Sequence, residues 1–330
     1  MSMIETRMPP EDIILPDLPI VDAHIHLWDR TGFDYFAPNY LADVDDGHNV
    51  TSSIYVECNM GYDPSLPEDM KPVSEIHYVM DQIAQGEGKP HNLSAGILGA
   101  ANLLLGREVK PILDAQIAAS EDRFRGVRYR VAFDDDPEAG YHEIGYLNEN
   151  VLDRQELLDA AKLMAEMGLV LDLWAFHPQL EDVKEFARQV PDLQIVLDHI
   201  GGPLGVGRYA PMRQEVFEHW SKGIKSLSDA ENVTVKLSGL GISRLGHKFE
   251  GGHLKTSSDQ LVEAWSPYVR TCLDAFGPER SVFGSNYPVD RQAASYRVLL
   301  NGFKKMLQDL SRDELNAIFH DNAKRIYRLP

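Results

Sequence analysis

The sequence has little cysteine, little basic charge for its acid content and no long apolar run. Cys58 and Cys272 are its only cysteines among 330 residues, which argues against a disulfide framework and suits a reducing compartment. Lysines and arginines number 32 against 51 aspartates and glutamates, a net charge of −19 that repels nucleic acid and anionic membranes. The longest apolar stretch, SAGILGAANLLL, is too short and too rich in glycine to span a bilayer. We therefore expect neither a nucleic-acid nor a membrane partner.

The first residues also lack the features of a targeting signal. MSMIETRMPPEDIILPDLP is acidic and rich in proline, without the basic start or the apolar centre of a signal peptide. We expect a cytoplasmic protein in which residues 1–19 form an N-terminal extension. The content of 43% apolar and 25% charged residues is that of an ordinary globular protein.

The chain repeats a pattern of apolar, β-rich runs separated by segments with helical spacing. The helical pattern is clear in QLEDVKEFARQV and in VLDRQELLDAAKLMAEMG, which stops at Gly168. A capping box of Ser311 and Glu314 opens SRDELNAIFHDNAKRIYRL, so residues 311–330 are predicted to form a C-terminal helix. Eight strand-like runs begin at Ile20, Ser52, Leu93, Phe124, Leu169, Leu193, Asn232 and Arg280.

This alternation predicts an α/β protein, a (β/α)8 TIM barrel built as a single domain over residues 1–330. A doubly wound open sheet is the alternative fold, but its phosphate-binding glycine fingerprint after the first strand is absent. Enzymes with the barrel fold work at the C-terminal ends of the strands, so reactive side chains should gather there. They do, at His24, His26, Glu57, Arg128, Arg130, His177, His199, Lys236 and Asn286.

Three motifs in this order resemble the amidohydrolase superfamily: HxH on strand one, DHIGGP on strand six and FGSNYPVD on strand eight. VDAHIHLWD, RGVRYR, VKLSG and NAKRIYRL are similar to its amidohydrolase family 2 group. That group includes sugar-acid lactonases and pyrone dicarboxylate lactonase. The likeness runs from about Ile20 to Leu329, nearly the whole chain. It implies a barrel that hydrolyses a lactone, ester or amide by attack of an activated water.

The resemblance also implies roles for individual residues. In metal-dependent members the strand-one histidines, here His24 and His26, hold a divalent ion that is usually zinc. A strand-five histidine, matched by His177, can join them or contact the substrate. The strand-six histidine, matched by His199, polarises the substrate or moves a proton. Because Asp198 and His199 are adjacent on a strand, only one is expected to face the pocket.

The sequence departs from the family at strand eight. Members usually carry an aspartate that binds the metal and takes a proton from water, whereas this chain has Asn286. An amide cannot act as a general base at neutral pH. Asp290 and Glu57 are the substitute bases that we expect. A metal-free site is a second possibility, because pyrone dicarboxylate lactonase needs no ion and the two histidines could instead grip substrate oxygen.

Several residues keep two interpretations. Arg128 is predicted to hold a substrate carboxylate as a guanidinium fork, while Arg130 is left unassigned. Glu57 and Lys236 either line the site or form buried ion pairs. Tyr287 is expected to form a pocket wall in contact with substrate.

The predicted function is therefore hydrolysis of a lactone, or of a related ester or amide, of a carboxylated or polyhydroxylated small molecule. A metal-dependent decarboxylase of a hydroxylated acid is the first alternative, because that chemistry needs no nucleophilic water. A catalytically degenerate barrel that only binds a ligand is the second. Members of the group are often dimers or larger, so a homo-oligomer is possible as well.

Overall fold

A computed structural model describes residues 10–141, 147–250 and 252–330. Eight parallel strands form one sheet in chain order, each hydrogen-bonded to the next. This confirms the predicted barrel. The strands are β1 (Ile20–Ile25), β2 (Val50–Val56), β3 (Asn92–Gly99), β4 (Phe124–Arg130), β5 (Val170–Trp174), β6 (Ile195–Leu197), β7 (Val233–Leu237) and β8 (Ser281–Phe283).

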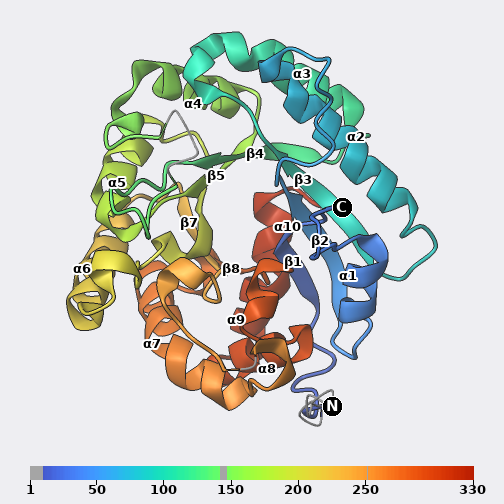
Figure 1. Ribbon diagram of the computed structural model, residues 1–330, viewed down its shortest axis with the longest axis vertical. Helices are drawn as coiled ribbons and strands as arrows, with labels where there is room; N and C mark the ends of the chain where they lie inside the picture. Colours follow the sequence, from blue (N-terminus) through green and yellow to red (C-terminus); the bar gives the residue numbers. More distant parts are fainter. Residues whose placement is uncertain (1–9, 142–146, 251) are drawn as a thin grey trace.

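Helices follow the strands and surround the sheet (Figure 1). The apolar residues that give QLEDVKEFARQV its helical pattern are buried in α5 (Leu180–Gln189). Gly168 follows α4 (Gln155–Glu166) in the left-handed region with φ 68°, as expected for a residue that ends a helix. Among the helices that the structure describes, none is both long and apolar enough to cross a bilayer. The α-helices between strands are α1 (Ala37–Val44), α2 (Lys71–Ala84), α3 (Lys110–Ala119), α4 (Gln155–Glu166), α5 (Leu180–Gln189), α6 (Arg213–Leu227) and α7 (Ser258–Phe276). The first α-helix after β8 is α8 (Tyr296–Met306).

The barrel closes between β1 and the segment that follows β8. A parallel bridge joins Ile25 to Tyr287, and the amide of Asn286 donates to the carbonyl of His24 over 2.9 Å. His26 N in turn donates to the Tyr287 carbonyl over 2.8 Å. The residues predicted as the strand-one and strand-eight motifs are thus adjacent through their backbones.

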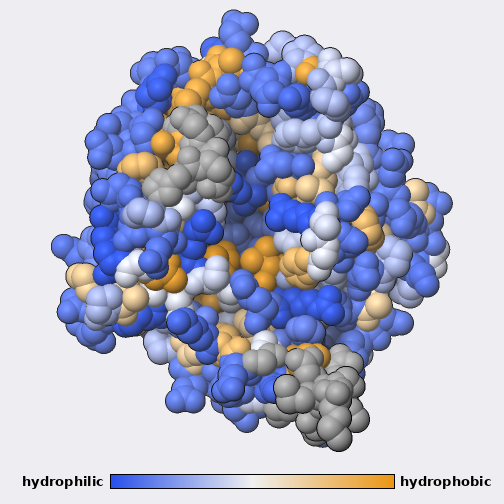
Figure 2. Space-filling model, viewed as in Figure 1, coloured by the Kyte–Doolittle hydropathy of each residue, from blue (hydrophilic) through white to orange (hydrophobic). Residues whose placement is uncertain are grey.

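The end of the chain packs against buried side chains of the barrel strands. Ser311 caps α9 (Arg312–Asn316) together with Glu314, as predicted, and a π-helical turn (Ala317–Asp321) leads into α10 (Asn322–Ile326). Tyr327 packs in a buried cluster with inward residues of the strands, and its hydroxyl donates to Asp172 on β5 over 2.9 Å. The face shown in Figure 2 is hollowed near its centre, inside the ring of helices.

Candidate active site

The two strand-one histidines lie at the carboxyl end of β1, and both are buried. Their Nε2 atoms are 3.2 Å apart. His26 Nδ1 lies 2.8 Å from the Val56 carbonyl, which can only accept, so Nδ1 carries the proton and Nε2 presents a lone pair. Burial lowers the pKa of both imidazoles well below the ordinary value, so both are neutral at physiological pH.

The strand-six motif leaves regular β geometry directly after β6. His199 and Ile200 adopt φ values of 50° and 53°, in the left-handed region. The His199 ring lies 4.5 Å from that of His24, centroid to centroid, and its Nδ1 is 2.9 Å from Ser238 Oγ. Gly239 makes this possible, because a Cβ there would overlap the His199 ring. Burial lowers the pKa of His199 to about 3.

Asp198 also points into the barrel, so the strand alternation used above does not hold here. Its Oδ1 lies 3.4 Å from His24 Nδ1 and 3.0 Å from the ammonium of Lys236. Burial raises the pKa of Asp198, but Lys236 and then His24 outweigh burial and hold it well below the usual value. The sequence interpretation missed the contact with His24 because it assumed that the strand continued.

Lys236 is fully buried beneath these side chains, bonded to Asp172 as well as to Asp198. Burial lowers its pKa, but the two carboxylates raise it above the ordinary value overall. Lys236 is not among the residues that line the cavity described below. Its position is that of a buried ion-pair partner and not that of the predicted substrate-binding residue.

Glu57 and Arg128 form a second buried ion pair. Arg128 Nε donates to the Glu57 carboxylate, and Nη2 donates to the Glu57 carbonyl over 2.9 Å. This contact fixes the guanidinium, which lines the cavity as predicted. Glu57 does not line it, and its carboxylate is already engaged. The structure therefore gives no support to Glu57 as a general base.

Asn286 lines the cavity, whereas Asp290 lies behind it. Asn286 Nδ2 donates to Asp290 Oδ1 over 2.8 Å, and Gly241 N donates to Oδ2 over 3.0 Å. Burial raises the pKa of Asp290 to about 7, although the two hydrogen bonds act to lower it. With its nitrogen directed at Asp290, the Asn286 amide keeps its oxygen for the cavity. Asp290 can act on the site only through Asn286, which differs from its predicted role as base.

His177 and Tyr287 also lie outside the cavity lining. His177 accepts from Leu204 N over 3.3 Å and packs edge-on against Tyr209 and His219, at centroid distances of 5.2 and 5.5 Å. The hydroxyl of Tyr287 donates to the Ala294 carbonyl over 2.6 Å. Neither side chain lines the cavity, although the backbone carbonyl of Tyr287 accepts from His26 N, so the structure does not place these side chains where a ligand or a substrate contact would lie.

The cavity lined by His26 and His199 has a volume of about 260 Å³, just below the range usual for pockets that hold drug-sized ligands. Sequence reasoning missed several of its walls, because they come from loops or from a residue it left unassigned. These walls include Arg30, Arg130, Tyr141 and Arg244. The full lining is His26, Trp28, Arg30, Cys58, Asn59, Arg128, Arg130, Tyr141, Trp174, His199, Ile242, Ser243, Arg244, Asn286, Val289 and Gln292.

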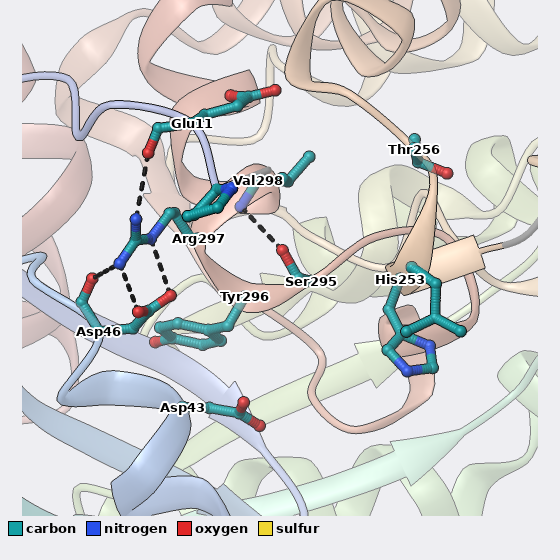
Figure 3. A pocket seen from close by; sticks show the side chains of 11 residues that line it. Glu11, Asp43, Asp46, His253, Thr256, Ser295, Tyr296, Arg297 and Val298 are labelled. Atoms are coloured by element: carbon teal, nitrogen blue, oxygen red, sulfur yellow. Dashed lines mark hydrogen bonds and ion pairs between the residues drawn. The ribbon is translucent and has the colours of Figure 1, made fainter. Parts of the chain in front are cut away.

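A second cavity, of about 310 Å³, is slightly larger but lies elsewhere. Figure 3 shows Arg297 at its edge, bonded to Asp46 and to the Glu11 carbonyl. None of the strand-one or strand-six histidines lines it. Its polar groups fasten the N-terminal segment to α8, so we place the chemistry in the smaller cavity.

Comparison with known proteins identifies the family of the chain. The model of the amidohydrolase family matches residues 21–329. The chain belongs to the amidohydrolase family. Among relatives of this amidohydrolase, an uncharacterized protein of Sinorhizobium fredii is 32% identical and covers 96% of this chain and all of its own. An L-fucono-1,5-lactonase of Burkholderia ambifaria is 25% identical, over 94% of this chain and 95% of its own.

A solved structure shows the same fold. It is that of an amidohydrolase from Burkholderia multivorans with bound zinc, which superposes with a TM-score of 0.71 at 21% identity. The match covers 94% of this chain and 99% of that chain. At this identity the likeness concerns the fold.

The residues of this chain fit a divalent ion. His24, Asp198 and His199 each offer one ligand atom within 4.8 Å of the others. Tetrahedral zinc with Zn–N bonds of 2.0–2.1 Å separates two ligand nitrogens by about 3.3 Å, close to the 3.2 Å between the Nε2 atoms of His24 and His26. Both Asp198 oxygens lack a hydrogen bond of good geometry within the described residues, so this buried carboxylate is held mainly by the charge of Lys236 at 3.0 Å and lies beside His24 at 3.4 Å.

The surroundings of the imidazoles favour the Nε2 side of His24 for the ion. Lys236 Nζ already lies 3.4 Å from His24 Nδ1 and 3.0 Å from Asp198, so an ion on that side would meet its charge. Histidines that bind metal usually give the other ring nitrogen to a carboxylate or a carbonyl. Asp198 takes this place beside His24, and the Val56 carbonyl takes it beside His26. These contacts would leave the Nε2 atoms of His24 and His26 as nitrogens that could hold an ion.

Proposed function

We propose that this amidohydrolase opens a lactone, or cleaves a related ester or amide, of a small carboxylated or polyhydroxylated molecule. The observation that supports this most strongly is the arrangement of His24, His26 and His199. Each has its Nδ1 beside a polar partner, and each is neutral. His26 and His199 line the cavity, and His24 Nε2 lies 3.2 Å from His26 Nε2. The lactonase relative of Burkholderia ambifaria supports the same reaction class.

His24 and His26 would hold a divalent ion, and we propose zinc. Such an ion polarises a carbonyl and makes a water molecule a nucleophile at neutral pH. The amide oxygen of Asn286, at the wall of the cavity, is available as a neutral ligand or as a hydrogen-bond acceptor. An amide in place of a carboxylate leaves the site more strongly cationic, which favours an anionic substrate.

The remaining steps fall to residues that line the cavity. Arg128, oriented by Glu57, binds a carboxylate of the substrate. His199 is neutral and takes the proton of the attacking water at Nε2 as the water oxygen bonds to the carbonyl carbon. The ring C–O bond then breaks, and His199 returns the proton to the leaving oxygen. Ser238, at Nδ1 of His199, holds the ring in place for both transfers.

The test is a panel of lactones assayed by acid release, with wild-type enzyme and with His199→Gln. Ring opening by the wild type and a loss of 10²–10⁴-fold in kcat for the variant are expected, the size of a general acid–base effect. Equal rates would remove His199 from the mechanism. Release of carbon dioxide from hydroxylated acids would instead favour the decarboxylase. Tight binding without product would favour the degenerate barrel.

A further inference from the structure

The cavity carries an unusual charge for a protein with a net charge of −19. Four arginines line it: Arg30, Arg128, Arg130 and Arg244. Among the described residues that line it, none is an aspartate or a glutamate. Glu57 neutralises Arg128 from behind, and Arg30 and Arg244 contribute positive charge to the walls.

The four guanidinium groups occupy two levels. Arg128 is buried at 7% exposure, near His26, whose pKa it helps to lower. Arg130 and Arg244 are half-buried and flank one ring, with their guanidinium carbons 4.9 and 4.0 Å from the Tyr141 centroid. Arg30 is exposed and stacks on Trp28 at 4.1 Å. The arginines thus divide into one at the base and three nearer the opening.

Arg30 and Arg244 are held in place with donors to spare. Arg244 donates hydrogen bonds from Nε to the Ala139 carbonyl over 3.0 Å and from Nη2 to the Gly140 carbonyl over 3.3 Å. Arg30 donates a hydrogen bond from Nη2 to the Cys58 carbonyl over 3.1 Å. A guanidinium has five N–H groups, so each side chain is fixed by its backbone contacts and still offers N–H groups to a ligand.

From this arrangement we infer that the substrate carries two acidic groups, one bound by Arg128 and the other by Arg30 and Arg244 near the opening. The inference rests on the proposed function and narrows its substrate class. A neutral polyhydroxylated lactone presents O–H groups, and these donate their strongest hydrogen bonds to charged carboxylates of the protein. The described lining offers no carboxylate for them. A small molecule with two carboxylates, or with a carboxylate and another oxyanion, matches these walls.

The test is calorimetric binding of three probes that cannot be hydrolysed: benzene-1,3-dicarboxylate, benzoate and the neutral polyol galactitol. The dicarboxylate should bind at least tenfold more tightly than benzoate, and galactitol should bind most weakly. Arg244→Gln combined with Arg30→Gln should abolish the advantage of the dicarboxylate and leave benzoate unchanged. Arg128→Gln should weaken both acids.

Two controls keep the result interpretable. Glutamine can still donate to the carbonyls that Arg244 holds, and Arg30→Gln alone changes only an exposed side chain, so at least one variant should remain folded by thermal unfolding. Arg107→Gln removes an exposed arginine that pairs with Glu166 outside the cavity, and should change nothing.

Equal affinity for the two acids, or an unchanged preference in the variants, would overturn the inference. This outcome is separate from failure of the proposed function. If neutral lactones were hydrolysed as fast as acidic ones, the proposed hydrolase function would stand and the second anion site would be refuted. If the dicarboxylate bound selectively but no lactone were hydrolysed, the second anion site would stand and the proposed hydrolase function would be refuted.

Discussion

Asn286 stands between Asp290 and the cavity, with its side-chain nitrogen 2.8 Å from Asp290 Oδ1. Because the other carboxylate oxygen accepts from Gly241 N, both oxygens of Asp290 are engaged. An aspartate four residues after Asn286 therefore orients the amide that replaces the family's usual base. It does not meet the substrate itself.

Asp290→Asn should consequently lower kcat by about tenfold, less than the 10²–10⁴-fold typical of a general base. The new amide can accept from Asn286, but its own nitrogen then faces the N–H of Gly241, which cannot accept. Steady-state kinetics measure the change, with the exposed Asp274→Asn on α7 as the control. A fall of a hundredfold or more would restore Asp290 as the base.

The stability of this variant should depend on pH in a defined direction. Burial raises the pKa of Asp290 from 3.8 to about 7 in the folded protein. A raised pKa contributes stability that is fully present below the unfolded value and is lost as the pH rises through 7. Asn does not titrate. The deficit of the variant against wild type in thermal unfolding should therefore be larger at pH 5 than at pH 8, and a deficit that grew with pH would contradict this position of Asp290.

Lys236→Met should be strongly destabilising. It leaves Asp172 and Asp198 buried without their shared cation, and loss of one partner of a buried ion pair costs about 3–5 kcal/mol. Urea unfolding measures the loss, with Lys222→Met on the exposed side of α6 as the matched control. Adding Asp172→Asn should recover part of the stability, because it removes one of the two uncompensated charges. Lys236→Met as stable as its control would refute the buried network.

His177→Gln distinguishes the ligand set predicted from the sequence, which includes His177, from the proposed pair of His24 and His26. His177 contacts Leu204, Tyr209 and His219 outside the cavity, so the variant should keep its metal content and its turnover. A glutamine oxygen can still accept from Leu204 N. Loss of metal comparable to that in His26→Gln would return His177 to the ligand set.

The fold and the central histidines could be predicted because they depend on local patterns. The two-residue period of β1 brings His24 and His26 to one face, and the order of strands and helices specifies the barrel. The approach of Asp198 to His24 could not be predicted from the sequence, because it depends on the left-handed turn at His199. No strand rule predicts that turn.

Loops account for most of the remaining differences. Arg30 and Arg244 reach the cavity from segments whose course no periodicity describes. His177 enters a short 3-10 helix (His177–Gln179) that turns its ring toward His219 on α6. Tyr287 has the predicted place after β8, but its hydroxyl is captured by the Ala294 carbonyl. In each case a tertiary contact decided the direction of a side chain whose position in the chain was already clear.

The central claim is that His24 and His26 direct their Nε2 atoms at one divalent ion. Elemental analysis of protein purified without a histidine tag or added metal tests it most directly, with His26→Gln prepared in parallel. We expect about one zinc per wild-type chain, by the ligand chemistry of two neutral imidazoles, and none in the variant. A metal-free wild type whose activity a chelator does not change would contradict the claim. The two histidines would then hold substrate oxygen without an ion.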